Sequence, residues 1–333
     1  MSRPLPLVLA LVALVGCPAR GPAPAPDAGT ARAPPPRDGP VTDYAAHLAP
    51  AGAFTTLRTF SQAGHRWRLV VDPRTLVTSV QLDDGAPARP DVPLDELPKS
   101  PWREALALAV ADGRSLENSG WTHVLPKESG VVLMVDLCPS HRRFDRRLVE
   151  RLLEVVEPKE RPVPVAFAVS GTWLEAHADD LEWLKRLDGR DLAITWINHS
   201  MHHRVVRGAP LVRNFLLAPG TDARREVLDA EVAMLERGLI PSVFFRFPGL
   251  VSEPSLVTLV TALGLVPVGS DAWLAKRERP RPGSIVLVHG NGNEEAGVDD
   301  FLQLLAQERL AISARQFLLL DLRDSVAETE DAG

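Results

Sequence analysis

The stretch VVLMVDL, residues 131–137, decides the fold of most of this chain. It is the first of seven short runs that are almost continuously apolar, a pattern typical of strands buried on both faces of a parallel sheet. The other six runs are VPVAFAV (163–169), DLAITWI (191–197), SVFFRF (242–247), LVPVG (265–269), SIVLVH (284–289) and QFLLLDL (316–322). The sequence therefore predicts a sheet of about seven strands.

Segments with a helical period lie between most of these runs. The clearest are RRLVERLLEVV (146–156), WLEAHADDLEWLKRL (173–187), TDARREVLDAEVAMLERG (221–238) and SEPSLVTLVTALG (252–264). Strands that alternate with helices pair in parallel through right-handed crossovers. The pattern predicts either a closed barrel or an open doubly wound sheet. No glycine-rich phosphate-binding motif follows the first run, which disfavours a nucleotide-binding fold.

The region before residue 129 has a different pattern and is predicted to form a small α+β module over residues 51–128. Three runs separated by turn residues predict an antiparallel meander: FTTLRTF (54–60), HRWRLVV (65–71) and LVTSVQL (76–82). A helix is expected at 101–111, PWREALALAVA, because apolar residues recur there at helical spacing and Gly113 follows. No cluster of catalytic residue types occurs in this region.

The first 17 residues, MSRPLPLVLALVALVGC, have the pattern of a secretory signal, with an early arginine, a short apolar stretch and small residues. The apolar stretch is too short to span a bilayer. Its ending, LVGC, resembles the bacterial lipoprotein signal, which implies that Cys17 becomes a lipidated first residue. Ordinary cleavage near Ala19, which discards Cys17, is the alternative. A lipid anchor predicts a protein of the cell envelope, and Pro18 favours the outer membrane or cell surface.

Composition limits the remaining segments and the partners. Residues 18–50 are rich in proline and almost free of bulky apolar side chains, so we predict a disordered tether there and a disordered tail at 326–333. The net charge is −6 and no basic stripe is present, which argues against a nucleic-acid partner. The two cysteines are Cys17 and Cys138, so lipidation of Cys17 leaves no disulfide within the chain.

Polar side chains occur where the predicted strands end. They are Asp136 in the first run, Asn198 and His199 after the third, Arg246 in the fourth, Asp271 after the fifth and His289 at the end of the sixth. The carboxyl ends of parallel strands share one edge, where the sites of such folds are built. We therefore expect these side chains to meet.

His199 and His203 lie four residues apart in NHSMHH, residues 198–203. One helical turn or a tight loop can direct both imidazoles at one metal ion. The spacing alone is also that of an ordinary polar loop. The carboxylate, arginine and histidine at the other strand ends favour the metal site.

Five segments in order resemble the motifs of the polysaccharide deacetylase family, carbohydrate esterase family 4. They are LMVDLCPS (133–140), NHSMHH (198–203), FRFPGL (245–250), DAW (271–273) and LVH (287–289). The resemblance covers about residues 131–322 and does not extend upstream. It implies that residues 129–325 form a distorted (β/α) barrel of about seven parallel strands, preceded by the small β-rich N-terminal module.

The resemblance also implies roles for the matching residues. It implies that Asp136 is the general base and that Arg246 keeps this base charged. His199 and His203 are implied as ligands of a divalent metal, usually zinc. His289 is implied as the general acid, and Asp271 as the residue that tunes it. Substrate contacts are expected from Asn198, Pro248, Trp273 and Asn291. Trp273 could instead belong to the core, and the loop that holds Asn291 could be a polar turn.

One departure from the family pattern concerns the third metal ligand. The pattern has an aspartate where this chain has Leu137, and leucine cannot bind a metal. The consequence is a site with two histidines and water, a substitute ligand, or lost metal affinity. The thiolate of Cys138 would suit zinc, although a buried cysteine after a strand more often serves packing.

The predicted function is metal-dependent hydrolysis of acetyl groups, N-acetyl before O-acetyl, on a glycan of the envelope or the extracellular space. The alternative is a glycan-binding lipoprotein without catalysis, which Leu137 favours, whereas pure binding leaves the acid and base unexplained. A glycosidase would need two close carboxylates. Asp136 and Asp271 are the obvious pair, and the histidines would then have no role.

Overall fold

A computed structural model describes residues 39–331 except 84, 86–89 and 113–115. The described residues belong to one compact unit. The predicted signal at 1–17, Cys17 and most of the predicted tether lie outside the described residues. None of the described helices is both long and apolar enough to cross a bilayer.

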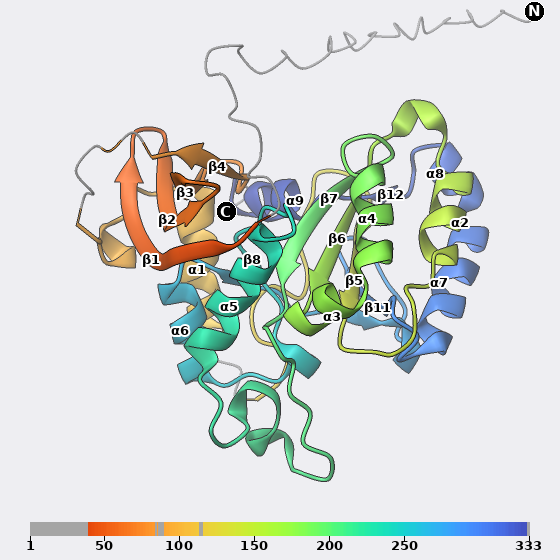
Figure 1. Ribbon diagram of the computed structural model, residues 1–333. Helices are drawn as coiled ribbons and strands as arrows, with labels where there is room; N and C mark the ends of the chain where they lie inside the picture. Colours follow the sequence, from red (N-terminus) through yellow and green to blue (C-terminus); the bar gives the residue numbers. More distant parts are fainter. Residues whose placement is uncertain (1–38, 84, 86–89, 113–115, 332–333) are drawn as a thin grey trace, which may run out of the picture. The chain divides into compact units, whose positions relative to one another are not determined.

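The larger sheet is a curled sheet of parallel strands, as predicted (Figure 1). Its strands are β5 (Gly130–Leu137), β6 (Val163–Val169), β7 (Leu192–Asn198), β8 (Phe244–Phe245), β9 (Val266–Pro267), β10 (Ala272–Trp273), β11 (Ile285–His289) and β12 (Leu318–Leu319). The order is β10-β11-β5-β6-β7-β8-β9, and β12 pairs with β5. Each of the seven apolar runs contains a strand, and the short strand β10 is the addition.

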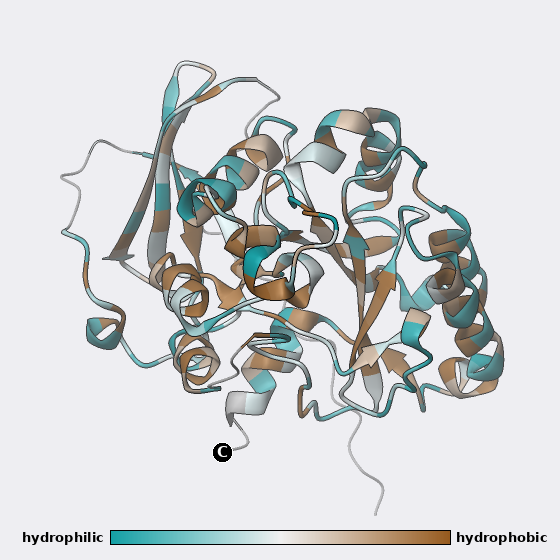
Figure 2. Cartoon of the chain, turned by 90° about the horizontal axis from the view of Figure 1, so that it is seen from below, coloured by the Kyte–Doolittle hydropathy of each residue, from teal (hydrophilic) through white to brown (hydrophobic). Residues whose placement is uncertain are grey.

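Helices pack against the sheet as the alternating pattern predicts. They are α2 (Arg147–Val155), α3 (Gly171–Ala176), α4 (Ala178–Leu187), α5 (Ala223–Leu235), α6 (Pro254–Ala262), α7 (Glu295–Gln307), α8 (Arg309–Ser313) and α9 (Leu322–Asp331). Figure 1 shows α2, α7 and α8 along one side of the sheet. In Figure 2 the sheet is mostly hydrophobic, whereas the helices also carry hydrophilic residues.

Successive residues of β5 face two different apolar clusters. Leu133, Val135 and Leu137 pack with residues of α2, α4 and α7, whereas Val132 and Met134 pack with the N-terminal region. This alternation follows from the period of two of a strand. It places Asp136 on the face opposite to Leu137.

Residues that precede the sheet in sequence form bridges at both of its ends, beside the edge strand β9 and beside the segment that leads into β11. Trp121 forms a parallel bridge with Val268, just after β9, and His123 forms an antiparallel bridge with Ser284, just before β11. The backbone N–H of Trp121 donates to Pro267 O at 3.0 Å. Residues 121–123 therefore connect the two ends of the sheet.

The N-terminal module is a four-stranded antiparallel sheet with one helix. The strands are β1 (Val41–Ala51), β2 (Phe54–Gln62), β3 (His65–Val71) and β4 (Thr78–Leu82), in the order β1-β2-β3-β4. The helix α1 (Pro101–Ala111) begins after Ser100, whose side chain accepts a hydrogen bond from Arg103 N. The predicted meander and helix are confirmed.

Two predicted boundaries are wrong. All of strand β1 except Ala51 lies in the segment predicted as a tether at 18–50. Pairing with β2 satisfies its backbone, and Leu48 and Ala49 bury its apolar side. The predicted tail at 326–333 begins inside α9. That helix is ordered by the burial of Val326 and by the bond from Leu125 N to Thr329 Oγ1.

A buried ion pair joins the N-terminal module to α5. Arg58 of β2 donates from Nε and Nη2 to the two carboxylate oxygens of Glu231, at 2.7 and 2.9 Å. The Nη1 group donates to Leu57 O and Leu263 O, and the Tyr44 hydroxyl donates to Glu231 Oε2 at 2.8 Å. Arg58 and Glu231 are fully buried, Tyr44 is partly buried, and each nitrogen of the guanidinium donates a hydrogen bond.

Candidate active site

The strand ends bring five of the predicted side chains together. Asp136 and His289 are paired positions on the neighbouring strands β5 and β11, and Arg246 follows β8 directly. His199 follows β7, and its Nε2 lies 3.9 Å from Asp136 Oδ2. His203 lies beside His199, with 4.8 Å between the ring centroids. The predicted meeting of a carboxylate, an arginine and histidines at one edge is confirmed.

Arg246 orients one side of the Asp136 carboxylate. Its Nε donates to Asp136 Oδ2 at 3.3 Å, and its Nη1 donates to the backbone oxygens of Val268 and Gly269. Burial alone would raise the pKa of Asp136, but Arg246, His199 and His289 outweigh burial and lower it. Asp136 Oδ1 and Arg246 Nη2 are buried without a hydrogen bond to any described residue. The pair is charged and only half satisfied.

Cys138, His199 and His203 form a buried cluster with the chemistry of a metal site. One potential ligand atom from each lies within 4.8 Å of the others, and Cys138 Sγ is 3.5 Å from His199 Nε2. The His199 ring bonds Arg246 O through Nδ1 at 2.8 Å, which assigns Nδ1 as the donor and leaves Nε2 with a lone pair. The cluster therefore presents a soft thiolate and two imidazoles, a donor set that suits zinc.

His203 is the member of this cluster that the protein leaves open. Both of its ring nitrogens are buried and make no hydrogen bond to a described residue. Its ring lies edge-on to Phe215 at 5.4 Å, and its backbone N–H donates to Ser200 Oγ. A buried imidazole without a partner is costly, and a metal ion bound by one ring nitrogen would reduce this cost. The residues present therefore fit a metal ion.

Cys138 lies where a substitute for the missing third metal ligand would have to lie. Leu137 is fully buried in the apolar cluster of α2, α4 and α7 and faces away from the histidines. The next residue, Cys138, reaches them from the same side as Asp136. Cys138 is buried, as a packing residue would be, and it also brings a potential metal-ligand atom to the two histidines. The alternation of side chains along β5 is the sequence signal that could have indicated it.

Two residues expected to contact substrate instead hold the loops of the site. Asn198 is fully buried, donates from Nδ2 to Val227 O and accepts from Ser200 N. Asn291 is also fully buried and donates from Nδ2 to Cys138 O at 2.5 Å. Pro248 is buried as well. All three side chains are buried, and those of Asn198 and Asn291 bond to the protein itself, so the structure gives no support to their expected contacts with substrate.

His289 is oriented by a residue to which the sequence argument gave no such role. Its Nδ1 lies 2.8 Å from Glu294 Oε2, which also accepts a hydrogen bond from Trp273 Nε1 at 2.7 Å. The Trp273 ring lies 5.8 Å from the His289 ring and carries Lys276 Nζ at 3.7 Å above its face. Trp273 therefore lies beside the reacting face, and its contact with substrate stays a prediction.

Asp271 does not contact His289, which corrects the predicted tuning role. The neighbouring Ala272 pairs with Val286, so Asp271 lies beside the first residue of β11, at the end opposite to His289. Its carboxylate accepts from Ile285 N at 3.1 Å and meets His123 Nδ1 at 2.8 Å. Asp271 directly precedes β10, which runs parallel to β11, so Asp271 lies at the end of these strands away from the active edge.

Burial and neighbouring groups shift the pKa values of Cys138, His199 and His289 in different directions. Burial raises the pKa of the Cys138 thiol, but His203 and His289 outweigh burial and lower it to about 7. Burial lowers the pKa of His199 to about 4, so this imidazole is neutral and able to bind a metal. Burial lowers the pKa of His289 too, but Cys138 and Glu294 outweigh it and raise the value well above its ordinary range.

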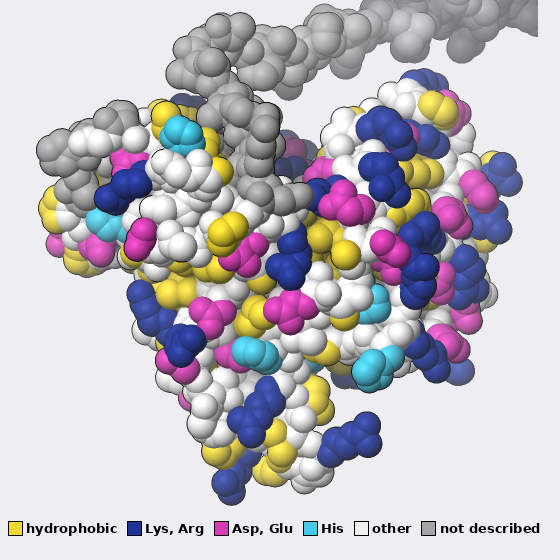
Figure 3. Space-filling view, viewed as in Figure 1, with side chains coloured by type: hydrophobic (Ala, Val, Ile, Leu, Met, Phe, Trp, Pro, Cys, Tyr) yellow, Lys and Arg dark blue, Asp and Glu magenta, His cyan; other side chains and the backbone are white. Residues whose placement is uncertain are grey.

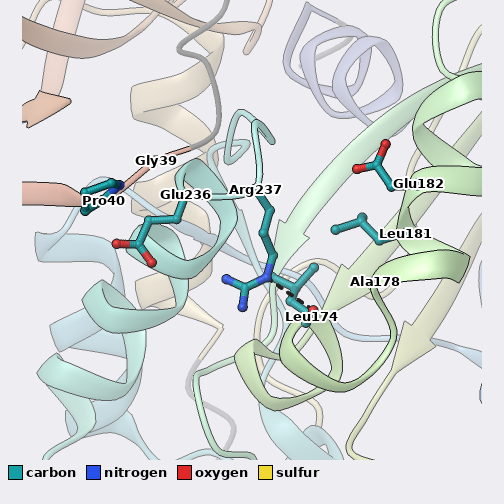
Figure 4. Close-up of a pocket in the computed structure, with 8 residues that line it drawn as sticks. All are labelled: Gly39, Pro40, Leu174, Ala178, Leu181, Glu182, Glu236 and Arg237. Carbon is teal, nitrogen blue, oxygen red and sulfur yellow. Dashed lines mark hydrogen bonds between the residues drawn. The ribbon is translucent and has the colours of Figure 1, made fainter. Parts of the chain in front are cut away.

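A cavity of about 510 Å³ lies elsewhere and is lined by Gly39, Pro40, Leu174, Ala178, Leu181, Glu182, Glu236 and Arg237 (Figure 4). Its lining contains none of the predicted site residues. Arg237 Nε donates to Leu174 O, and Glu236 Oε1 accepts from Val41 N. These polar groups serve packing, so the strand ends remain the candidate site.

No model of a known protein family matches the chain. Among solved structures, a family 4 carbohydrate esterase from Bacillus anthracis is similar with a TM-score of 0.45 and 20% identity, covering 66% of this chain and 90% of that one. Bacillus subtilis PdaA, a family 4 carbohydrate esterase, gives 0.45 and 18%, with 68% and 88% covered. BA3943, a family 4 pseudoenzyme from Bacillus anthracis, gives 0.42 and 13%, with 61% and 66% covered.

All three structures are described as members of the family whose motifs this sequence resembles, and they include esterases and a pseudoenzyme. The names of these proteins do not distinguish catalysis from its loss in this chain. We therefore argue the function from the side chains of the site.

Proposed function

We propose that this protein is a metal-dependent hydrolase that removes acetyl groups, N-acetyl before O-acetyl, from a glycan. The observation that carries the proposal is the buried cluster of Cys138, His199 and His203, in which both nitrogens of His203 lack a hydrogen bond to any described residue. Beside it lie a charged carboxylate and a histidine held by a second carboxylate. A metal site flanked by a base and an acid supports hydrolysis rather than binding alone.

Each group has a task that its contacts define. A bound divalent ion, which we propose to be zinc, supplies a Lewis acid that polarises the acetyl carbonyl and lowers the pKa of water toward neutrality. Asp136 accepts the proton of the attacking water at Oδ1, because Arg246 occupies Oδ2 and keeps the carboxylate charged. His289 donates a proton from Nε2 to the departing group, because Glu294 holds Nδ1.

Cys138 as a third ligand supports this proposal over a metal-free glycan-binding protein. Leu137 alone favoured the metal-free alternative. The thiol of Cys138, with a pKa of about 7, lies 3.5 Å from His199 Nε2 and would supply the ligand that Leu137 cannot. The amine or alcohol that leaves, and the identity of the glycan, are set by contacts outside this cluster.

Metal content and acetate release test the proposal together. The purified protein is expected to hold close to one zinc per chain by elemental analysis and to release acetate from acetylated oligosaccharides. His203→Ala and Cys138→Ser should lose most of the zinc and the activity. The matched control is His202→Ala, since His202 is exposed and its ring meets Glu226 rather than the cluster. Full acetate release by zinc-free protein, or zinc retained in His203→Ala, would overturn the metal proposal.

We also propose that the protein is held at the cell envelope, at the outer membrane or cell surface, by lipid on Cys17. The support is the sequence LVGC followed by a proline-rich segment. Mass spectrometry of the N-terminal peptide should find acyl chains on Cys17, and Cys17→Ser should release the protein into the aqueous phase of a detergent partition. An unmodified Cys17, or cleavage near Ala19, contradicts this assignment.

A further inference from the structure

The connection from β7 to α5 is an insertion with its own surface. It spans residues 199–222, far longer than the 2–6 residues that usually join a strand to the next helix of a parallel sheet. It carries two 3₁₀ turns, η3 (Leu211–Arg213) and η4 (Phe215–Leu217). Figure 1 shows it projecting beyond the helices at the lower edge. Insertions of this length in a compact fold are usually functional.

The inner side of this insertion is fixed to the candidate active site. Phe215 lies against the ring of His203, and Leu216 is buried in one apolar cluster with Phe245. Asn214 bonds Val206 N and Val206 O with its side chain, at 2.8 and 3.0 Å. These contacts give the segment one defined shape, so its outer surface is a preformed one.

The outer side exposes aliphatic side chains that no described residue covers. Val205 is 58% exposed, Val212 57% and Leu211 36%. These three residues lie within residues 205–212, a segment that the hydrogen bonds between Asn214 and Val206 hold in shape. We call residues 204–213 the docking loop. Aliphatic groups gathered on one exposed loop mark a contact surface.

The docking loop also carries positive charge without any negative charge. It contains Arg204, Arg207 and Arg213, all exposed, and no Asp or Glu occurs between residues 199 and 221. Arg204 donates to Pro219 O, and none of the three forms an ion pair with a described carboxylate. The whole chain has a net charge of −6. In Figure 3 the projection at the bottom carries Lys or Arg side chains together with hydrophobic ones.

We propose that the docking loop binds an anionic lipid surface. Aliphatic side chains enter the boundary between headgroups and acyl chains, and neighbouring arginines pair with anionic headgroups. An acidic polysaccharide would account for the arginines but not for three exposed aliphatic side chains, since sugar rings are bound by aromatic faces. The lipid surface accounts for both. This inference goes beyond the proposed hydrolase function and does not depend on it.

The docking loop begins at the residue after His203, so lipid binding would place the active site close to the membrane surface. Glycans carried on or near lipid would then reach the site, whereas distant polymer would not. The net negative charge of the remaining protein would turn its other faces away from an anionic surface. The contact would thus select one orientation.

Vesicle sedimentation tests the proposal with the full chain carrying Cys17→Ala in every arm, so that no lipid is attached there. Vesicles of phosphatidylglycerol and phosphatidylcholine in equal parts should bind the protein at least about tenfold more tightly than pure phosphatidylcholine vesicles. Binding to the anionic vesicles should weaken when the salt is raised from 0.1 to 0.5 M. Equal binding to both vesicle types overturns the proposal.

Two double variants separate the two parts of the loop. Arg207→Gln with Arg213→Gln removes two charges and should weaken anionic binding by about tenfold or more. Val205→Ser with Val212→Ser should weaken it to a similar extent through lost apolar contact. The matched control is Arg309→Gln with Leu310→Ser on α8, an exposed arginine and an 83% exposed leucine, which should not change binding.

Circular dichroism and the unfolding midpoint of each variant should equal those of the parent, since the replaced side chains are exposed. A loss of vesicle binding in the α8 control as large as that in the docking-loop variants overturns the proposal. So does retention on immobilised polygalacturonate without any binding to vesicles, because that result assigns the loop to an acidic glycan.

Discussion

Two arginines of this protein are fully buried beside a carboxylate, and the two pairs differ in how far their polar atoms are satisfied. Arg58 contacts both oxygens of Glu231 and donates its remaining groups to backbone oxygens. Arg246 contacts one oxygen of Asp136, and both partners keep a buried atom without a hydrogen bond to a described residue. The first pair lies between the N-terminal module and α5, and the second lies at the ends of the parallel strands.

The difference separates a structural role from a chemical one. A buried polar network in which every donor and acceptor is used holds one arrangement and has no capacity left for a ligand. A buried pair with open atoms costs stability, and the cost is retained where those atoms act on a substrate or ion. We therefore propose that Arg58 and Glu231 stabilise the fold, whereas Arg246 and Asp136 take part in the proposed reaction.

The largest effect on catalysis is expected from removing the charge of Asp136, and the matched change at Glu231 should have almost none. Asp136→Asn should lower kcat/KM for acetate release by about 10²–10⁴-fold, because the amide cannot accept a proton. Glu231→Gln should leave kcat/KM of the folded protein within about twofold. Both variants are assayed where circular dichroism shows them folded. If Glu231→Gln lowered kcat/KM as much as Asp136→Asn does, the distinction would fail.

A large effect on stability is expected at the other pair. Arg58→Met leaves Glu231 buried without its partner and should lower the free energy of unfolding by about 3–5 kcal/mol. Replacing both members, as Arg58→Met with Glu231→Leu, should recover most of this loss, because no uncompensated charge remains. Urea unfolding measures both variants. A double variant no more stable than Arg58→Met would show that the pair contributes more than compensation of charge.

A smaller effect is expected at the carboxylate that holds His289. Glu294→Gln should lower kcat by about 10–100-fold with little change of KM, because Gln cannot stabilise the protonated imidazole as a carboxylate does. Glu295→Gln is the matched control, since Glu295 is exposed and pairs with Arg142 at the surface. An equal loss in both variants would assign Glu294 to loop structure.

The smallest effect on catalysis is expected at Asp271. Asp271→Asn should leave kcat within about twofold, because its carboxylate bonds His123 and Ile285 N at the far end of β11. The free energy of unfolding should fall by about 1 kcal/mol through weaker hydrogen bonds. Steady-state kinetics and urea unfolding check both values. A hundredfold loss of kcat would restore the tuning role implied by the family resemblance.

The strands of the parallel sheet could be predicted because a strand buried on both faces appears in the sequence as a continuous apolar run. The strand ends could be predicted for the same reason, and with them the meeting of Asp136, His199, His203, Arg246 and His289. Strand β1 was missed because it lies at the edge of its sheet, where a strand needs few apolar side chains.

At the site, the sequence predicted where the functional residues lie but not which way each side chain points. Whether Leu137 or Cys138 faces the histidines depends on which way a strand places each side chain, and the motif comparison counts positions only. Whether Asp271 or Glu294 reaches His289 depends on a crossing between sheet edges that the sequence does not display. The local sequence therefore predicts where the site lies, whereas the contacts among its side chains depend on the tertiary structure.

The bridges of Trp121 to Val268 and of His123 to Ser284 also bear on how the chain folds. The segment that forms these bridges is made early in synthesis, but the strands on either side of it are made near the end. Such long sequence separation slows folding, since the loop must close before the contact stabilises it. Until then β9 and the segment before β11 lack these bridges, and their open backbone groups can pair with another chain. Removing residues 39–128 should therefore yield an aggregating fragment rather than an independent barrel.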